Sequence, residues 1–270
     1  MSALAISRPW GIMGITAFAE LISPGRIAAT AVRLSVQLLL VVFLWRALYE
    51  DTTISGGLTK AQAVSYAVLA VLAMRLRGQD RWHARDMVIQ HVQYGTIVYW
   101  FLRPLSAQRY YLLRACGDQL YGFAWAAVGF AACRVVGVLA GPASAGAAIA
   151  FALTLALGQS VLYYLTLLTD QLCFWTIRNG SAVAILIFVL NLLSGGYAAL
   201  WYFPGWFQAL SAVLPFQATL GVPLSFFIGR LSLSDLPAQL TVEASWILVL
   251  ATITRLTWRR AAERVVSQGG

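Results

Sequence analysis

Few residues of this chain have the types and spacing that catalysis requires. Asp118 and Asp170 could suggest an aspartyl intramembrane protease, but there is no second glycine two residues before Asp118 and no tyrosine before Asp170. Asp118 instead stands four residues after Arg114, where a local ion pair is expected on a helix. His83 and His91 fall in one charged loop, which leaves no intramembrane serine–histidine pair. We therefore expect no catalytic residue.

Metal and nucleotide chemistry are also disfavoured. The 3 cysteines, Cys116, Cys133 and Cys173, are isolated and indicate neither a metal site nor a disulfide framework. Lys60 is the single lysine and no G-x-x-x-x-G-K-[ST] motif occurs, so the chain does not bind ATP through a P-loop. The basic residues are spread along the predicted membrane boundaries and form no nucleic-acid patch. We expect no cofactor or metal in this chain.

The composition places the chain in a membrane. Its 270 residues are 60% hydrophobic and 11% charged, whereas globular domains are roughly 45–50% apolar and about 25% charged. This balance excludes a soluble enzyme core, a disordered chain and a secreted disulfide scaffold.

Six stretches are predicted to be transmembrane helices, because about 20 mostly apolar residues cover the hydrocarbon core. The second and sixth are short and need their flanking charged side chains to reach towards water. The sequence therefore predicts an all-α membrane protein with six transmembrane helices, in a single domain over residues 1–270. The six stretches are Ala28–Leu48, Ala61–Leu76, Tyr110–Leu139, Ala145–Leu168, Ser181–Tyr202 and Leu240–Trp258.

The basic residues are divided unequally between the two sides of these spans. Fourteen fall on the side that holds the N-terminus, the loop after the second span, Arg178 and the C-terminal tail, four fall on the other side, and Arg33 lies inside the first span. Cytoplasmic loops carry the excess of arginine and lysine. Both termini are therefore predicted to be cytoplasmic, which agrees with an even number of spans.

Residues 9–26 are predicted to form an amphipathic helix in the membrane interface. Glu20 and Pro24 break its apolar run, so we do not expect a cleaved signal peptide. Trp10 and Phe18 would face lipid in such a helix.

The cytoplasmic stretch of residues 77–105 carries much of the inner charge. Within it, Asp86–Leu102 alternates apolar and polar residues and ends at Arg103-Pro104, because proline disfavours a helical residue before it. A helix lying along the membrane is either a docking surface for a soluble partner or part of a solvated loop that only sets the topology. The residues alone leave both interpretations open.

The outer stretch of residues 201–238 is unusually apolar for a loop and contains Pro204, Pro215 and Pro223. Hydrophobic backbone outside a span must be buried in protein or enter the interface. We therefore predict broken, re-entrant helices between the fifth and sixth spans.

Polar residues inside the spans have two interpretations. Arg33 either extends towards water or faces a polar cavity, where a charge within a span usually marks function. The amides are either cavity residues or hydrogen-bonding partners between helices. The run Ser194-Gly195-Gly196 permits close backbone packing or a local break. The amides are Gln37, Gln119, Gln159 and Asn191.

Several short motifs follow one another along the chain in a recognisable order. They are QYGTIVYWFLRPLS at Gln93–Ser106, FWT at Phe174–Thr176, LSGGY at Leu193–Tyr197, WYFP at Trp201–Pro204, LPFQ at Leu214–Gln217, GVP at Gly221–Pro223 and WRRA at Trp258–Ala261. Each is weak alone, but from about residue 10 to the C-terminus their order and spacing resemble the type 2 ABC exporter permease family. The resemblance is to its bacterial six-span branch.

This resemblance implies a six-span permease with an amphipathic N-terminal helix, a cytoplasmic coupling helix and outer re-entrant helices. It implies two ATP-binding cassette ATPase subunits, which bind the ATP and Mg²⁺, and a second permease that is identical or related. The location would be the bacterial cytoplasmic (inner) membrane, among membrane lipids and without nucleic acid. The function would be export of a hydrophobic or amphipathic substrate. The alternative is a membrane scaffold or assembly subunit that transports nothing.

The candidate site residues form three groups. The resemblance favours an ATPase contact in the coupling segment, and it places a gate in the outer segment, whereas the transport-path candidates are chosen for their polarity. The contact candidates are Gln90, Gln93, Tyr94, Gly95, Thr96 and Arg103; the path candidates are Arg33, Gln37, Asn191 and Ser194; the gate candidates are Phe203, Pro204, Leu214, Pro215 and Phe216.

Overall fold

The computed structural model describes residue 11 and residues 24–49, 58–77, 91–92, 94–96, 107–176 and 180–268. These residues form α-helices (α), 3₁₀ helices (η) and turns, with no strand among them, which confirms the all-α class. Most of the predicted interfacial helix at residues 9–26 lies outside them. In chain order the elements are α3 (Pro24–Leu48), α4 (Lys60–Leu76), α7 (Ala107–Val135), α8 (Ala145–Gln171), α9 (Cys173–Thr176), α10 (Gly180–Leu193), η2 (Leu200–Tyr202), α11 (Gly205–Val213), η3 (Gln217–Thr219), α12 (Gly221–Phe227), η4 (Leu233–Asp235) and α13 (Leu236–Gln268).

Three described stretches are long and apolar enough to cross a membrane: Ile27–Leu48, Ala145–Thr176 and Leu233–Ala261. They coincide with the first, fourth and sixth predicted spans. The helices at the second and fifth positions are shorter, with 17 residues in α4 and 14 in α10. Helices therefore stand at all six predicted positions, while the six-span topology itself stays a prediction.

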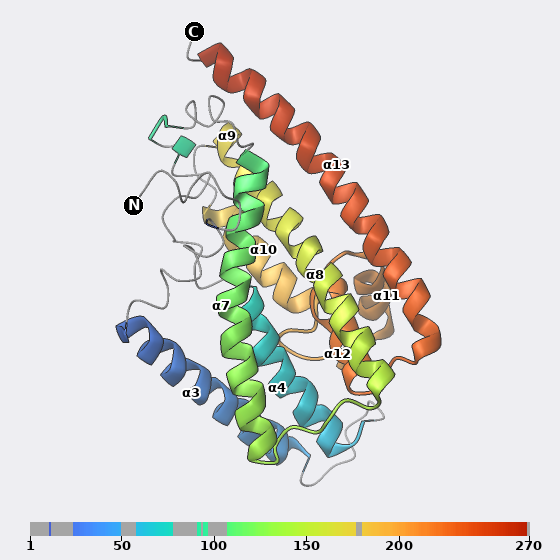
Figure 1. Cartoon of the computed structure of the whole chain (residues 1–270). Coiled ribbons are helices and arrows are strands. Elements are labelled where there is room, and N and C mark those ends of the chain that lie inside the picture. Colours follow the sequence, from blue (N-terminus) through green and yellow to red (C-terminus); the bar gives the residue numbers. More distant parts are fainter. Residues whose placement is uncertain are drawn as a thin grey trace.

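Helix α4 is the centre of the bundle. Almost every residue from Ala63 to Ala73 is buried, and Val68 is fully so. A helix that is apolar all round is one that is covered all round. Its neighbours are α3, α7 and α12, while α13 packs along α8 on the other side of the molecule (Figure 1).

The fifth span was predicted as Ser181–Tyr202, and its C-terminal end is placed too late in the chain. Helix α10 stops at Leu193, because Gly195 adopts a left-handed φ of 80° that favours glycine. The N–H of Gly196 then donates to the carbonyl oxygen of Asn191 at 2.8 Å and closes the helix end. The Ser194–Gly196 run is therefore a local break.

Short helices fill the outer segment between α10 and α13, as the prolines predicted. Pro204 precedes α11 and Pro215 precedes η3, so each proline stands where a helix begins. These helices fold back into the bundle, since η3 and α12 both pack against α8, and α12 also contacts α4. Entry of this segment into a bilayer stays a prediction.

Basic residues gather at the two ends of the bundle. The end that holds the start of α7 and the later turns of α13 is opposite the end that holds the start of α4 and the end of α7 (Figure 1). The first end carries Arg109, Arg114, Arg255, Arg259 and Arg260, and the second carries Lys60, Arg134 and Arg230. This partition agrees with the two sides drawn from the sequence.

The packing of α8 on η3 generates a stability prediction. A Cβ added at Gly158 would overlap the carbonyl oxygen of Ala218 and lie 2.9 Å from its carbonyl carbon, and neither backbone atom can rotate away. Gly158→Ala should therefore lower the free energy of unfolding by about 1–3 kcal/mol, the usual penalty for overpacking. Thermal unfolding of the purified protein measures this. Gly25→Ala is the matched control, because nothing lies within 4 Å of its Cβ; equal unfolding temperatures for the two variants would contradict the predicted contact.

Candidate functional site

The structure describes two pieces of the predicted coupling segment, His91–Val92 and Tyr94–Thr96. We call these residues together the coupling turn. Gly95 has a φ of 69°, and its N–H donates to the carbonyl oxygen of Val92 at 3.2 Å. The ring of His91 and the hydroxyl of Thr96 are 2.9 Å apart and close the turn. Tyr94 is 79% exposed, so the turn presents an aromatic side chain on a fixed backbone. The contact candidates Gln90, Gln93 and Arg103 lie outside the described residues.

A buried aromatic cluster anchors this turn. Val92 packs against a cluster of buried residues that includes Tyr111 of α7, Phe174 of α9 and Ala261 of α13, and we call this cluster the anchor cluster. The rings of Phe174 and Trp258 meet edge to face, with centroids 5.7 Å apart. Displacement of the coupling turn would therefore disturb a cluster to which α7, α9 and α13 contribute residues. The cluster stands at the end of the bundle where α7 begins (Figure 1).

A buried arginine lies where α4 ends. Arg77 is 5% exposed and donates hydrogen bonds to three neutral side chains. One terminal nitrogen donates to Oδ1 of Asn191 at 2.6 Å, and the other donates to Oγ of Ser194 at 2.7 Å and to Oγ1 of Thr219 at 3.0 Å. We call these four residues the arginine hub. It joins α4 to the end of α10 and to η3.

The last turn of α4 is held on its other sides as well. A Cβ at Gly122 of α7 would overlap the carbonyl oxygen of Arg75, so the two backbones touch directly. Gly196 packs in the same way against the side chain of Met74. Arg75 also donates a hydrogen bond to Gln37 of α3. Four helices therefore meet at the point where the chain leaves α4 for the predicted coupling segment.

Three of the four transport-path candidates converge on this point. Asn191 and Ser194 are buried in the arginine hub, and Gln37 is bonded to Arg75. Arg33 lies on α3 and is exposed. In this conformation the three candidates link helices, and Gln119 likewise donates to Gln159 between α7 and α8 at 3.5 Å. Their part in a transport path stays a prediction.

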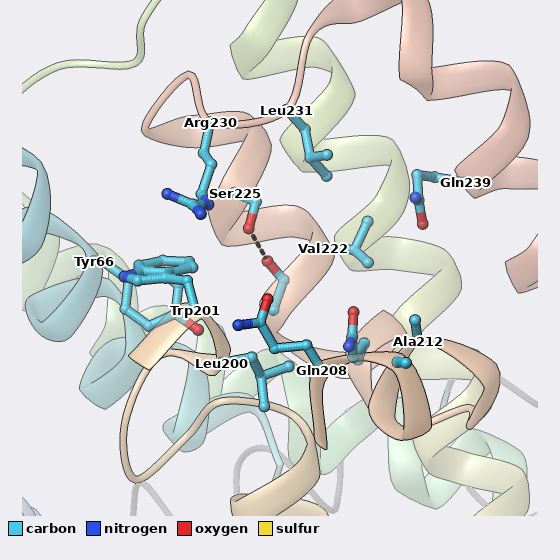
Figure 2. Close-up of a pocket in the computed structure, with 13 residues that line it drawn as sticks. Tyr66, Leu200, Trp201, Gln208, Ala212, Val222, Ser225, Arg230, Leu231 and Gln239 are labelled. Carbon is cyan, nitrogen blue, oxygen red and sulfur yellow. Dashed lines mark hydrogen bonds between the residues drawn. The ribbon is translucent and has the colours of Figure 1, made fainter. Parts of the chain in front are cut away.

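A cavity of about 390 Å³ lies among the outer short helices, between α11, α12 and α13. Three glutamines from different elements line it: Gln208 of α11, Gln217 of η3 and Gln239 of α13. Gln208 of α11, Arg230 of the loop after α12 and Gln239 of α13 surround the space in Figure 2. The guanidinium of Arg230 stacks over the ring of Trp201 at 4.6 Å. The wall offers amide donors and acceptors and contains no acidic side chain.

The outer gate candidates surround the short helices but do not line this cavity. Phe203 stacks on Phe207 with centroids 4.6 Å apart, and Pro215 is buried. Pro204 and Leu214 bound α11, and Phe216 precedes η3. Gating by these residues stays a prediction.

Glu243 is an unexpected polar group in the interior. It is 1% exposed within α13, and neither carboxyl oxygen has a hydrogen-bond donor among the described residues. It stands one helical turn after Gln239, which lines the cavity. On the following turns of α13, Trp246, Ile247 and Leu250 pack in one cluster with Ala218, the neighbour of Gln217. Glu243 therefore lies on the side of α13 that faces η3 and α8.

Sequence reasoning missed the arginine hub and Glu243. It counted Arg77 with a charged loop and treated Glu243 only as the boundary of a short span. One signal could have found the hub. Asn191 and Ser194 are three residues apart on an otherwise apolar helix, so they share a face and need a partner. Arg77 directly follows an apolar run, so it stands at the end of a helix from which its side chain can be that partner.

Comparison with known proteins gives a family match. The family model described as ABC-2 family transporter protein matches residues 35–269 of the chain. No curated protein and no solved structure matches it.

The isolated carboxyl of Glu243 generates a second prediction. A buried polar group without a partner costs about 1–3 kcal/mol, so Glu243→Met should raise the free energy of unfolding by a similar amount. Thermal unfolding in one detergent or nanodisc preparation measures the change. Glu263→Met is the control, since Glu263 is exposed on the same helix and should have no effect. A destabilised Glu243→Met protein would mean that the carboxyl has a partner.

Proposed function

This chain belongs to the ABC-2 transporter family, and from that membership we propose that it is the transmembrane permease subunit of an ATP-binding cassette exporter. It would move a hydrophobic or amphipathic substrate out of the cytoplasm. The ATP would be hydrolysed by a separate subunit, because the sequence contains no P-loop.

The coupling turn is the observation that carries this proposal. A surface that receives force from a partner must be exposed at its tip and fixed at its base. Tyr94 is largely exposed, while the adjacent Val92 is packed in the anchor cluster. A solvated loop that only sets topology needs neither feature. We therefore assign the ATPase contact to Tyr94, Gly95 and Thr96, with Gln90, Gln93 and Arg103 as further contacts in the same segment.

The arrangement of charge supports the orientation. The coupling turn lies at the end of the bundle that carries the arginines of α7 and α13, and such excess marks the cytoplasmic side. Both termini would then be cytoplasmic, in a bacterial inner membrane. Two ATPase subunits would reach the permease from that side.

A second permease, identical or related, would complete the complex. Helix α3 packs against α4 but leaves most of its surface uncovered, with Phe43 70% exposed and Leu40 64% exposed. In the proposed assembly this surface is covered by lipid or by the second permease. The transport path would run between the two chains, near Arg33, Gln37, Asn191 and Ser194.

The outer cavity supports an amphipathic cargo. Its glutamines and Trp201 suit a polar group that has hydroxyls or amides, while the apolar part of the cargo would remain against the helices. Phe203, Pro204, Leu214, Pro215 and Phe216 stand around the short helices next to this cavity and would gate the release of the cargo. ATP can drive export only if cargo binds the two conformations with different affinities.

The contact generates a third prediction. Tyr94→Asp should weaken binding of the ATPase about tenfold or more, because a charge replaces an exposed aromatic side chain that the proposed interface would bury. The measurement is the amount of Walker-type ATPase that co-purifies with the permease, together with its rate of ATP hydrolysis. Membrane insertion should be unchanged, since Tyr94 packs little against its own chain.

Val136→Asp is the matched control for this experiment. Val136 is 73% exposed, but it lies just beyond α7 at the opposite end of the bundle. It should therefore leave ATPase binding intact. If no ATPase co-purifies with the unaltered chain, the exporter proposal fails and the scaffold interpretation is preferred.

A further inference from the structure

Arg77 stands at a junction between the two functional regions. It is the residue at which α4 ends and the predicted coupling segment of residues 77–105 begins. Its own N–H still donates to the carbonyl oxygen of Met74 at 3.2 Å, so its backbone is fixed to the helix. Motion of the coupling segment reaches this residue first along the chain.

The side chain of Arg77 reaches the outer segment from this position. Its three acceptors belong to α10, to the residue that follows α10 and to η3: Asn191, Ser194 and Thr219. The hydroxyl of Thr219 accepts from Arg77 and donates to the carbonyl oxygen of Phe216 at 2.7 Å, which fixes its rotamer. A planar guanidinium with several donors can serve these acceptors together, whereas a lysine ammonium is a point charge on a flexible stem.

The arginine hub lies next to residues that line the outer cavity. Thr219 is two residues from Gln217, which lines that cavity. A Cβ at Gly221, another lining residue, would lie 3.0 Å from the carbonyl oxygen of Ser194. Tyr66, which lines the cavity as well, donates to the carbonyl oxygen of Gly195 at 3.2 Å. A shift of Ser194 or Thr219 therefore changes the cavity wall directly.

Arg77 can stay buried in the hub only if its hydrogen bonds offset the cost of removing its charge from water. Burial of a cation costs several kcal/mol, and the acceptors here are neutral. The Nε atom is buried and has no acceptor among the described residues. Three hydrogen bonds to a charged group, each worth about 1.5–3 kcal/mol, offset a penalty of similar size.

We propose that Arg77 is the positioning residue that transmits movement of the coupling segment to the outer cavity, through its bonds to Ser194 and Thr219. This inference rests on the proposed export function. In one conformation Arg77 holds the end of α10 and η3 together and keeps the cavity in the form seen here. When the ATPases displace the coupling segment, Arg77 shifts with the end of α4 and the cavity changes shape.

The test uses the complex of permease and co-purified ATPase in lipid nanodiscs. Ala212 lines the cavity and is exposed, so Ala212→Cys gives a site for a membrane-impermeant maleimide. The labelling rate is measured without nucleotide and with ATP plus vanadate, and the chain without the new cysteine gives the background. The rate of ATP hydrolysis is measured in parallel.

The expected result separates hydrolysis from the response of the cavity. ATP plus vanadate should change the labelling rate in the Ala212→Cys chain. Arg77→Gln and Thr219→Val should reduce this nucleotide-dependent change about tenfold, within the usual range of coupling between sites, while hydrolysis continues. Thr219→Ser keeps the hydroxyl and should restore the change. A purely structural role would leave the response intact in every variant that folds.

Control variants separate the role of Arg77 from general effects of losing an arginine. Arg134→Gln removes an arginine in the last turn of α7 that donates to the nearby carbonyl oxygen of Leu139, and this variant should respond normally. Thr219→Val decides the matter if Arg77→Gln does not fold. A full nucleotide-dependent change in Thr219→Val or Arg77→Gln would overturn the role of Arg77 while the exporter proposal stands. Absence of any bound ATPase would instead overturn the exporter proposal, and this inference with it.

Discussion

A guanidinium that is shut off from water must find its acceptors inside the protein, and this constraint organises the centre of the bundle. Arg77 can be satisfied only if α10 stops where its polar face is within reach and if η3 approaches the end of α4. The left-handed Gly195 permits the first condition. The absence of a Cβ at Gly158 permits the second, because η3 is packed between α8 and the hub. The break in α10 and the depth of the outer segment thus serve the same interaction.

The helical class and the positions of the main helices could be read from the sequence, since long apolar runs and proline breaks are local signals. Pro204 and Pro215 correctly marked the starts of short helices. The end of α10 could not be read in this way, because apolar residues continue beyond Gly196 and hydropathy does not report backbone conformation. The span prediction therefore ran on to Tyr202.

The candidate site was predictable only in part. The sequence predicted a helical run over Asp86–Leu102, whereas the structure describes a turn at Tyr94–Thr96, where Gly95 has a left-handed φ of 69°. The hub depends on side chains more than one hundred residues apart, so only the shared face of Asn191 and Ser194 hinted at it. The carboxyl of Glu243 is buried by packing of α13 on α8, and no local pattern reports such packing.

The length of α13 has a consequence for the surroundings of the protein. Its 33 residues extend about 50 Å, whereas a bilayer with its headgroups is about 40–45 Å thick. In the proposed orientation its later turns hold Arg255, Arg259 and Arg260 at the level of the cytoplasmic headgroups. Each such arginine gains about 1 kcal/mol from anionic phospholipid. The anchor cluster contains Ala261 of the same helix. The anionic lipid content of the inner leaflet would therefore affect how tightly the coupling turn is held against that cluster.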